Sequence, residues 1–153
     1  LHFDHAGGLP DFPHARVHVH RLEYEAMRNP HGWIELAYDR RDFEHGPRWA
    51  LYDQPAAEWR GLSAIRLPFK PEMYLIPLFG HTRGHCGVAV RAGDGWLFQC
   101  ADALPANADF DVTPNWLNRL VLGAHGPRLR AWAAANPDVR LLAGHMWLDA
   151  FIQ

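Results

Sequence analysis

The sequence predicts a mixed α/β domain in which helices cover a β-sheet. Two observations carry this prediction: the hydrophobic period changes from segment to segment, and strand-like and helix-like segments alternate along the second half of the chain. With 153 residues, of which 48% are hydrophobic and 21% charged, the chain has material for a sizeable core. We therefore expect one globular domain, or most of one, and not a disordered chain.

The first half of the chain contains one clear strand and one clear helix. Residues 15–20 alternate valine with polar neighbours, which predicts a half-buried strand. Helical composition begins at Arg21 and stops at Asn29-Pro30. Residues 31–70 scatter tryptophans among charges and prolines, and we interpret this range as an insertion that covers a substrate pocket or a partner subunit.

The second half begins with three predicted strands. Residues 73–79 form a short apolar run typical of a buried strand, in which Pro77 would suit an edge or a bulge. Residues 86–91 and 96–101 are strand-like and flank the sequence Ala-Gly-Asp-Gly, so they predict a β-hairpin.

Two helices and a last strand follow. Thr113-Pro114 is a typical helix start, and the apolar residues after it recur at helical spacing. A second helix is expected to follow Gly126-Pro127 and to end near Asn136. Residues 139–143 predict a buried strand that delivers Gly144-His145.

Charge and hydropathy exclude several classes of partner. The formal charge of −2, with both signs scattered along the chain, offers no basic face for nucleic acid. No apolar run approaches the roughly 18 residues that cross a bilayer, so we expect no membrane partner. Cys86 and Cys100 flank the hairpin turn; we expect free thiols in a reducing, cytoplasmic compartment, since their pairing depends on the strand register.

Four polar clusters lie at the ends of strand-like segments, where a sheet presents residues to a ligand. They are His2-Phe3-Asp4-His5, the sequence His-Thr-Arg-Gly-His at 81–85, Asp102, and Gly144-His145. Neutral imidazoles and carboxylates are ligands that zinc, iron and manganese accept. If the opening stretch is extended, a turn at Gly7-Gly8 would bring Asp4 and His5 to one point, where two metals could share the site.

These clusters resemble the signatures of the metallo-β-lactamase superfamily. Residues 2–8 are similar to the latter part of its HxHxDHxGG motif, and residues 80–85 to its GHTxGH segment. Residues 100–104 resemble its GDxL segment and Gly144-His145 its terminal GH, in family order. The resemblance implies an αββα sandwich, here without the N-terminal strands, so that residues 1–153 form a partial domain.

The resemblance also implies a ligand set for two Zn²⁺ ions, with iron or manganese as alternatives. His2 and His81 would bind the first metal, Asp4, His5 and His145 the second, and Asp102 would bridge both. The remaining family histidine would precede Leu1 by one position. We therefore expect the chain to be a fragment that binds metal poorly, and its complete parent to bind two ions.

Within the superfamily, residues 4–27 are similar to the N-acyl-homoserine lactonase branch. That branch carries a glycine where this chain has Ala101, a tyrosine at Pro105, and often an acidic residue at Met146. The resemblance implies a hydrolase in which a hydroxide held by two metals opens a lactone or cleaves an ester. Asp4 and Asp102 are the predicted catalytic residues, Asp4 because it would orient the hydroxide by a hydrogen bond.

Other activities use the same ligands and stay open. A glyoxalase II-like thioesterase and a β-lactamase-type amide hydrolase are the nearest alternatives; a mononuclear-iron relative and a non-catalytic binding module are the others. A small ester or lactone is the expected partner, and a homodimer is left open.

The other polar candidates are expected to stay outside the ligand set. His85 would support the metal loop by hydrogen bonds, and Arg83 is expected to face solvent more readily than to bind a substrate carboxylate. The remaining histidines are expected to be surface or core residues: His14, His18, His20, His31, His45 and His125.

Overall fold

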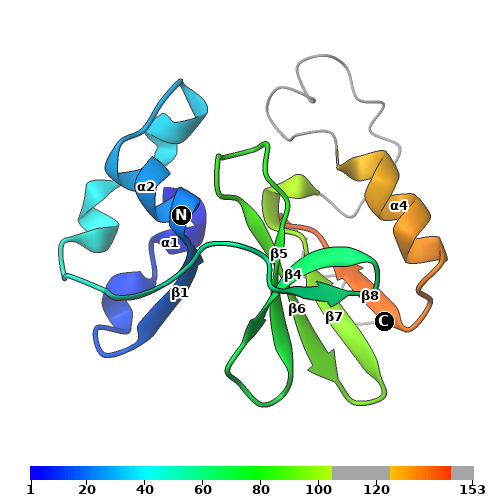
Figure 1. The fold of residues 1–153 in the computed structure, drawn as a ribbon. Helices are drawn as coiled ribbons and strands as arrows, with labels where there is room; N and C mark the ends of the chain where they lie inside the picture. The colour runs from blue at the N-terminus through cyan, green and yellow to red at the C-terminus, as the bar shows by residue number, and fades with distance from the viewer. Residues whose placement is uncertain (105–124, 146–153) are drawn as a thin grey trace. The chain divides into compact units, whose positions relative to one another are not determined.

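The computed structural model describes residues 1–104 and 125–145 (Figure 1). The chain divides into two compact units, which are described separately. Unit 1 comprises Leu1–Gln54 together with Thr82–Gly84, and unit 2 comprises Pro55–His81 and the chain from His85 onward. The helix predicted after Thr113 lies outside the described residues. In the described part of the chain, no helix has the length and apolar character needed to cross a membrane.

Unit 1 is built around a two-stranded parallel sheet and one regular helix. The strands β1 and β2 pair in register from Arg16↔Arg48 to His20↔Tyr52. Its elements in chain order are α1 (Phe3–Ala6), η1 (Leu9–Asp11), β1 (Arg16–His20), α2 (Arg21–Arg28), η2 (Ile34–Ala37), η3 (Arg40–Phe43) and β2 (Arg48–Tyr52).

The predicted strand and helix of unit 1 are confirmed as β1 and α2. The strand leads directly into the helix, because His20 ends β1 and also caps α2: its Nδ1 accepts a hydrogen bond from the backbone N–H of Leu22 at 3.2 Å. The helix ends at Arg28, ahead of Asn29-Pro30, since proline disfavours helical backbone in the residue before it. His20 is therefore a structural residue.

The opening stretch differs from the extended backbone considered for it. Phe3–Ala6 form a single helical turn, α1. The carbonyl of His2 accepts hydrogen bonds from the N–H groups of His5 and Ala6, at 3.0 and 2.8 Å. Ala6 is buried, so the turn packs one small face against the unit. Four residues are too few for a hydrophobic period to show, which is why the pattern left the conformation open.

Unit 2 contains a six-stranded sheet with the order β3-β4-β5-β6-β7-β8. All neighbouring pairs are antiparallel except β7 and β8, which are parallel. Figure 1 shows α4 running beside β8. The elements are β3 (Ala57–Trp59), β4 (Leu62–Leu67), β5 (Met73–Pro77), β6 (Cys86–Ala92), β7 (Gly95–Gln99), η4 (Ala101–Ala103), α4 (Gly126–Ala134) and β8 (Val139–Leu142).

Most predicted elements of unit 2 are confirmed. The hairpin forms as β6 and β7, closed by the pair Ala92↔Gly95, and Pro77 lies at the last position of β5, opposite Cys86. The range 31–70 contains β2, β3 and β4, which the sequence pattern did not reveal. Whether this range is an insertion relative to the family stays a prediction.

The core of unit 2 lies between the sheet and α4. Phe98, Ile76 and Leu129 are fully buried, and Trp59 packs edge-on against Phe98 at a ring distance of 5.3 Å. Cys100 is also buried, and burial raises the pKa of its thiol to about 12, so it stays protonated at neutral pH. Both cysteines are free thiols, as expected.

Candidate metal centre

Three of the predicted ligands follow strands of unit 2 that run in the same direction. The strand β6 is antiparallel to both β5 and β7, and β8 is parallel to β7. The carboxyl ends of β5, β7 and β8 therefore lie at one edge of the sheet, and His81, Asp102 and His145 come shortly after them. The sheet topology itself brings together three residues that are far apart in the sequence.

Asp102 lies between the two histidines. Its Oδ2 is 3.1 Å from Nε2 of His81, and its Oδ1 is 3.1 Å from Nε2 of His145. Asp102 is only 7% exposed, and the side chain of His81 is also largely buried. Each carboxylate oxygen thus faces a different imidazole. The bridging role that the family resemblance implies for Asp102 stays a prediction.

The backbone around Asp102 is tightly constrained. Ala101 has a φ of 45°, in the left-handed region that favours glycine. Its N–H donates to the side-chain oxygen of Gln99 at 3.1 Å, which helps to hold this conformation. The glycine that the lactonase branch carries at this position would adopt the same φ without strain.

The backbone at Gly144 lies so close to Ala101 and Asp102 that position 144 requires glycine. A Cβ at this position would lie 2.8 Å from the carbonyl carbon of Ala101 and 3.0 Å from Oδ1 of Asp102. The N–H of Gly144 donates to the carbonyls of Ala101 and Leu104, at 3.1 and 2.8 Å. The end of β8 is therefore locked onto η4, and this contact fixes where His145 leaves the strand.

His85 supports the loop that carries His81, as expected. Its Nδ1–H donates to the carbonyl of Leu78 at 3.1 Å, and its own carbonyl accepts from the N–H of Leu78 at 2.9 Å. These two bonds close the loop at its base. The rings of His81 and His85 lie edge to face, with centroids 5.7 Å apart.

The remaining predicted ligands lie in unit 1, on and beside α1. His2 is buried and its ring packs against Tyr38, with centroids 4.9 Å apart. Asp4 and His5 are partly exposed neighbours, with 3.7 Å between Oδ2 of Asp4 and Nε2 of His5. Three of the predicted ligands thus belong to unit 1 and three to unit 2. The assignment of all six to one metal centre stays a prediction.

Arg83 is exposed, as expected, but its guanidinium also binds its own chain. Its Nε donates to Oε1 of Glu35 at 2.9 Å, and its guanidinium also donates to the carbonyl of Asn29 at 2.7 Å. Glu35 is almost fully buried. Although part of the Arg83 side chain is exposed, its charged end is bound by its own chain.

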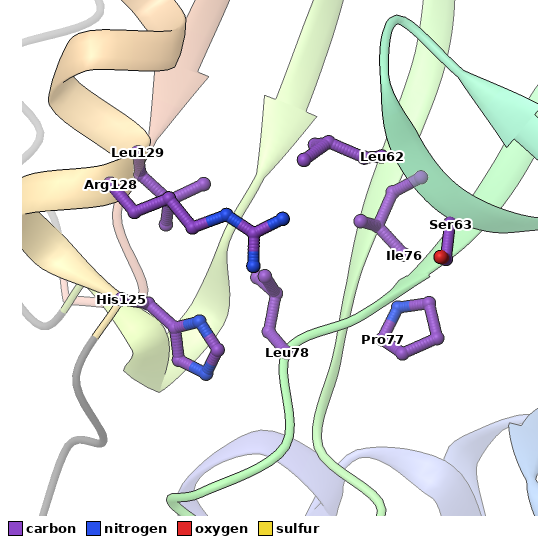
Figure 2. Close-up of a pocket in the computed structure, with 8 residues that line it drawn as sticks. All are labelled: Leu62, Ser63, Ile76, Pro77, Leu78, His125, Arg128 and Leu129. Carbon is purple, nitrogen blue, oxygen red and sulfur yellow. The ribbon is translucent and has the colours of Figure 1, made fainter.

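A small cavity in unit 2 lies apart from these ligands. It has a volume of about 90 Å³ and an apolar floor, and Figure 2 shows His125 and Arg128 pointing toward Leu78 at its rim. The volume is well below the roughly 300–1,000 Å³ of typical ligand pockets. Nε2 of His125 donates to the carbonyl of Phe79 at 2.8 Å, so this histidine is also structural.

The donor set fits a divalent transition metal. Imidazole nitrogens and carboxylate oxygens are the preferred protein ligands of Zn²⁺ in catalytic sites. A buried carboxylate between two imidazoles is costly unless positive charge accompanies it, and a bound cation supplies that charge. In unit 2, His81, Asp102 and His145 are the residues that would contact bound ions.

The mixed α/β fold and the histidines and aspartate after its strands agree with the family that the sequence motifs resemble. The chain belongs to the metallo-β-lactamase superfamily, whose family model matches residues 1–145. The sequence-based recognition of this family and its fold is confirmed.

Curated relatives are known in two mycobacteria. Probable metallo-hydrolases of Mycobacterium bovis and Mycobacterium tuberculosis are each 38% identical to this chain over 104 residues. The match covers 66% of this chain and 34% of each relative, so the chain spans about a third of their length.

Solved structures with the same fold include N-acyl homoserine lactonases. One is an N-acyl homoserine lactone hydrolase with the product N-hexanoyl-L-homoserine at its catalytic metal centre, at a TM-score of 0.67 and 20% identity, over 99% of this chain and 55% of that chain. Another is a dizinc quorum-quenching lactonase, at a TM-score of 0.61 and 15% identity, over 90% of this chain and 50% of that chain. At these identities the likeness shows the fold alone.

Proposed function

We propose that this chain carries the metal centre of a hydrolase that uses two divalent ions, Zn²⁺ above all, to open a lactone or cleave an ester. The observation that carries the proposal is Asp102, whose two carboxylate oxygens each face a different histidine at 3.1 Å. Family membership supports metal-dependent hydrolysis in general. The preference for a lactone rests on the resemblance of residues 4–27 and on the structural neighbours.

Within the proposal, the predicted ligands are divided between two metal ions. When bound, two divalent ions supply a water of lowered pKa as the nucleophile and polarise the substrate carbonyl. His2 and His81 would hold the first ion, and His5 and His145 the second. Asp102 would bridge both.

Asp4 would have two functions. It would contribute to the second ion and accept a hydrogen bond from the nucleophile, which orients the attack. Its partial exposure beside His5 is consistent with a residue that meets substrate.

The proposal is tested by turnover. The chain, and any longer natural protein that contains it, is assayed with an N-acyl lactone, a thioester and a β-lactam after loading with Zn²⁺. We expect the lactone to be hydrolysed fastest and His81→Ala to lower kcat/KM by more than about 1,000-fold, because a nucleophile generated at the metal is lost. His14→Ala, which removes an exposed histidine, is the matched control and should keep full activity.

Three results would change the assignment. Faster hydrolysis of the thioester or the β-lactam would replace the substrate class and leave the metal centre in place. Activity with one bound iron would favour the mononuclear relative. Full activity and unchanged metal content in His81→Ala would contradict the proposed site.

A further inference from the structure

The loop between His81 and His85 is held by unit 1. Its three middle residues, Thr82–Gly84, pack with unit 1, whereas the histidines at its two ends belong to unit 2. The hydroxyl of Thr82 donates to Oε2 of Glu23 at 2.5 Å. Thr82 and Glu23 are only 4% and 6% exposed, so this bond is shielded from water. A predicted metal ligand is therefore followed directly by a residue bound to a buried carboxylate.

Both oxygens of the Glu23 carboxylate accept hydrogen bonds from side chains of unit 1. The Tyr38 hydroxyl donates to Oε1 at 3.1 Å, and the Thr82 hydroxyl donates to Oε2. A hydrogen bond from Thr82 to an ionised acceptor is stronger than one between neutral groups.

The backbone of the loop also lies directly on α2. A Cβ at Gly84 would lie 1.9 Å from the backbone nitrogen of Glu23, which no side chain could tolerate. Glu23 thus contacts the loop twice, through its carboxylate at Thr82 and through its main chain at Gly84. Two contacts from one residue leave the loop little freedom to change conformation.

We propose that Glu23 and Thr82 form a positioning pair that fixes the conformation of the 81–85 loop and so sets the affinity with which His81 binds metal. The inference rests on the proposed function, since it takes His81 to be a ligand. Outer residues that orient a metal ligand typically contribute 10–100-fold to metal affinity. Neither residue would touch the ion itself.

The neighbouring pair Arg83–Glu35 contributes less. The Arg83 side chain is 40% exposed, and ion pairs that reach solvent stabilise a structure only weakly. The Thr82 hydroxyl and the Glu23 carboxylate are both buried, so breaking their bond leaves a desolvated acceptor with one donor fewer. The two pairs therefore predict different effects when each is removed.

The test compares Thr82→Val with Thr82→Ser. Valine keeps the shape of threonine without the hydroxyl, and serine keeps the hydroxyl. Affinity for Zn²⁺ is measured by competition with a chelator, the Co²⁺ complex by its d–d absorption spectrum, and the loop by amide hydrogen exchange in the metal-free chain. We expect about 10–100-fold weaker Zn²⁺ binding, a shifted Co²⁺ spectrum and faster loop exchange for Thr82→Val, and values near wild type for Thr82→Ser.

Further variants make each outcome decisive. Ser63→Ala removes an exposed hydroxyl elsewhere in unit 2 and should change nothing. Glu23→Gln, which weakens the acceptor, should reproduce the effect of Thr82→Val and replaces it if that variant does not fold. Arg83→Met should weaken Zn²⁺ binding less than about threefold.

The inference and the proposed function fail in different ways. If His81→Ala loses Zn²⁺ while Thr82→Val binds as wild type with unchanged loop exchange, the positioning pair is refuted and the function stands. If His81→Ala keeps Zn²⁺ affinity, the proposed site is wrong, and the inference with it. Equal losses in Thr82→Val and Thr82→Ser would also overturn the role of the hydroxyl.

Discussion

A single methyl group added at Gly144 tests the packing beneath the candidate centre. In Gly144→Ala the new Cβ would lie 2.8 Å from the carbonyl carbon of Ala101, 2.9 Å from its oxygen and 3.0 Å from Oδ1 of Asp102. Two of these three atoms belong to the backbone and cannot rotate away. The end of β8 would therefore have to move off η4, and His145 would move with it.

The cost of this movement has two parts. Overpacking at a rigid contact typically destabilises by about 1–3 kcal/mol. Weakening the bonds from the Gly144 N–H to Ala101 and Leu104 adds about 1 kcal/mol. A loss of about 2–4 kcal/mol corresponds to a fall in Tm of about 5–12 °C for a chain of this length. Because His145 shifts relative to Asp102, Zn²⁺ affinity should also fall, by about tenfold or more.

The assay is a thermal melt followed by circular dichroism, together with a Zn²⁺ competition titration. Gly126→Ala is the matched control, since a Cβ there has open space around it. It should leave Zn²⁺ affinity unchanged and stability equal to or up to about 1 kcal/mol above wild type. If Gly144→Ala behaved like Gly126→Ala in both measurements, the close approach of β8 to η4 would be refuted.

Three further substitutions test the backbone strain at Ala101, the packing of the core at Phe98 and the ionisation of Glu35. Ala101→Gly should raise the free energy of unfolding by about 0.5–1 kcal/mol in urea titrations, because glycine adopts a φ of 45° without strain; a loss would contradict this. Phe98→Ala should lower it by about 3–5 kcal/mol, since the ring is fully buried; a change below 1 kcal/mol would argue against the core. In Glu35, burial raises the pKa, but the hydrogen bonds from Arg83 and the His31 N–H outweigh it and lower the pKa below 4.5. The stabilisation that the ionised Glu35 contributes is therefore complete above about pH 4.5 and lost as the pH falls through the lowered pKa. Glu35→Gln should lower the free energy of unfolding at pH 7 by about 1–2 kcal/mol, and this difference from wild type should disappear in acid. A difference that does not depend on pH would refute the role of the Glu35 charge.

Local patterns were sufficient to predict much of the fold. The alternation in β1, the proline stop after α2 and the glycine-rich turn of the β6–β7 hairpin are each encoded within ten residues or fewer. The position of polar residues directly after β5, β7 and β8 was equally visible. Family order then assigned His81, Asp102 and His145 to one site, and the sheet topology shows why these three meet.

Other features depend on contacts that no local pattern reveals. The helical turn α1 is too short to have a period, and β3 and β4 lie in a range rich in charge and proline. From the sequence, Glu23 could be recognised only as a residue near the start of a helix. It is buried in the structure and bonded to Thr82, which is 59 positions away. Arg83 is exposed as predicted, but its bond to Glu35, 48 positions away, could not be predicted from local sequence.

The Asp102 carboxylate, set between His81 and His145, is proposed to hold metal. The most direct test is the Zn²⁺ affinity of Asp102→Asn, which keeps the shape of the side chain and removes its charge, measured beside wild type and His14→Ala. We expect binding at least about 100-fold weaker in Asp102→Asn, and no change in His14→Ala. Equal affinity in Asp102→Asn and wild type would contradict it.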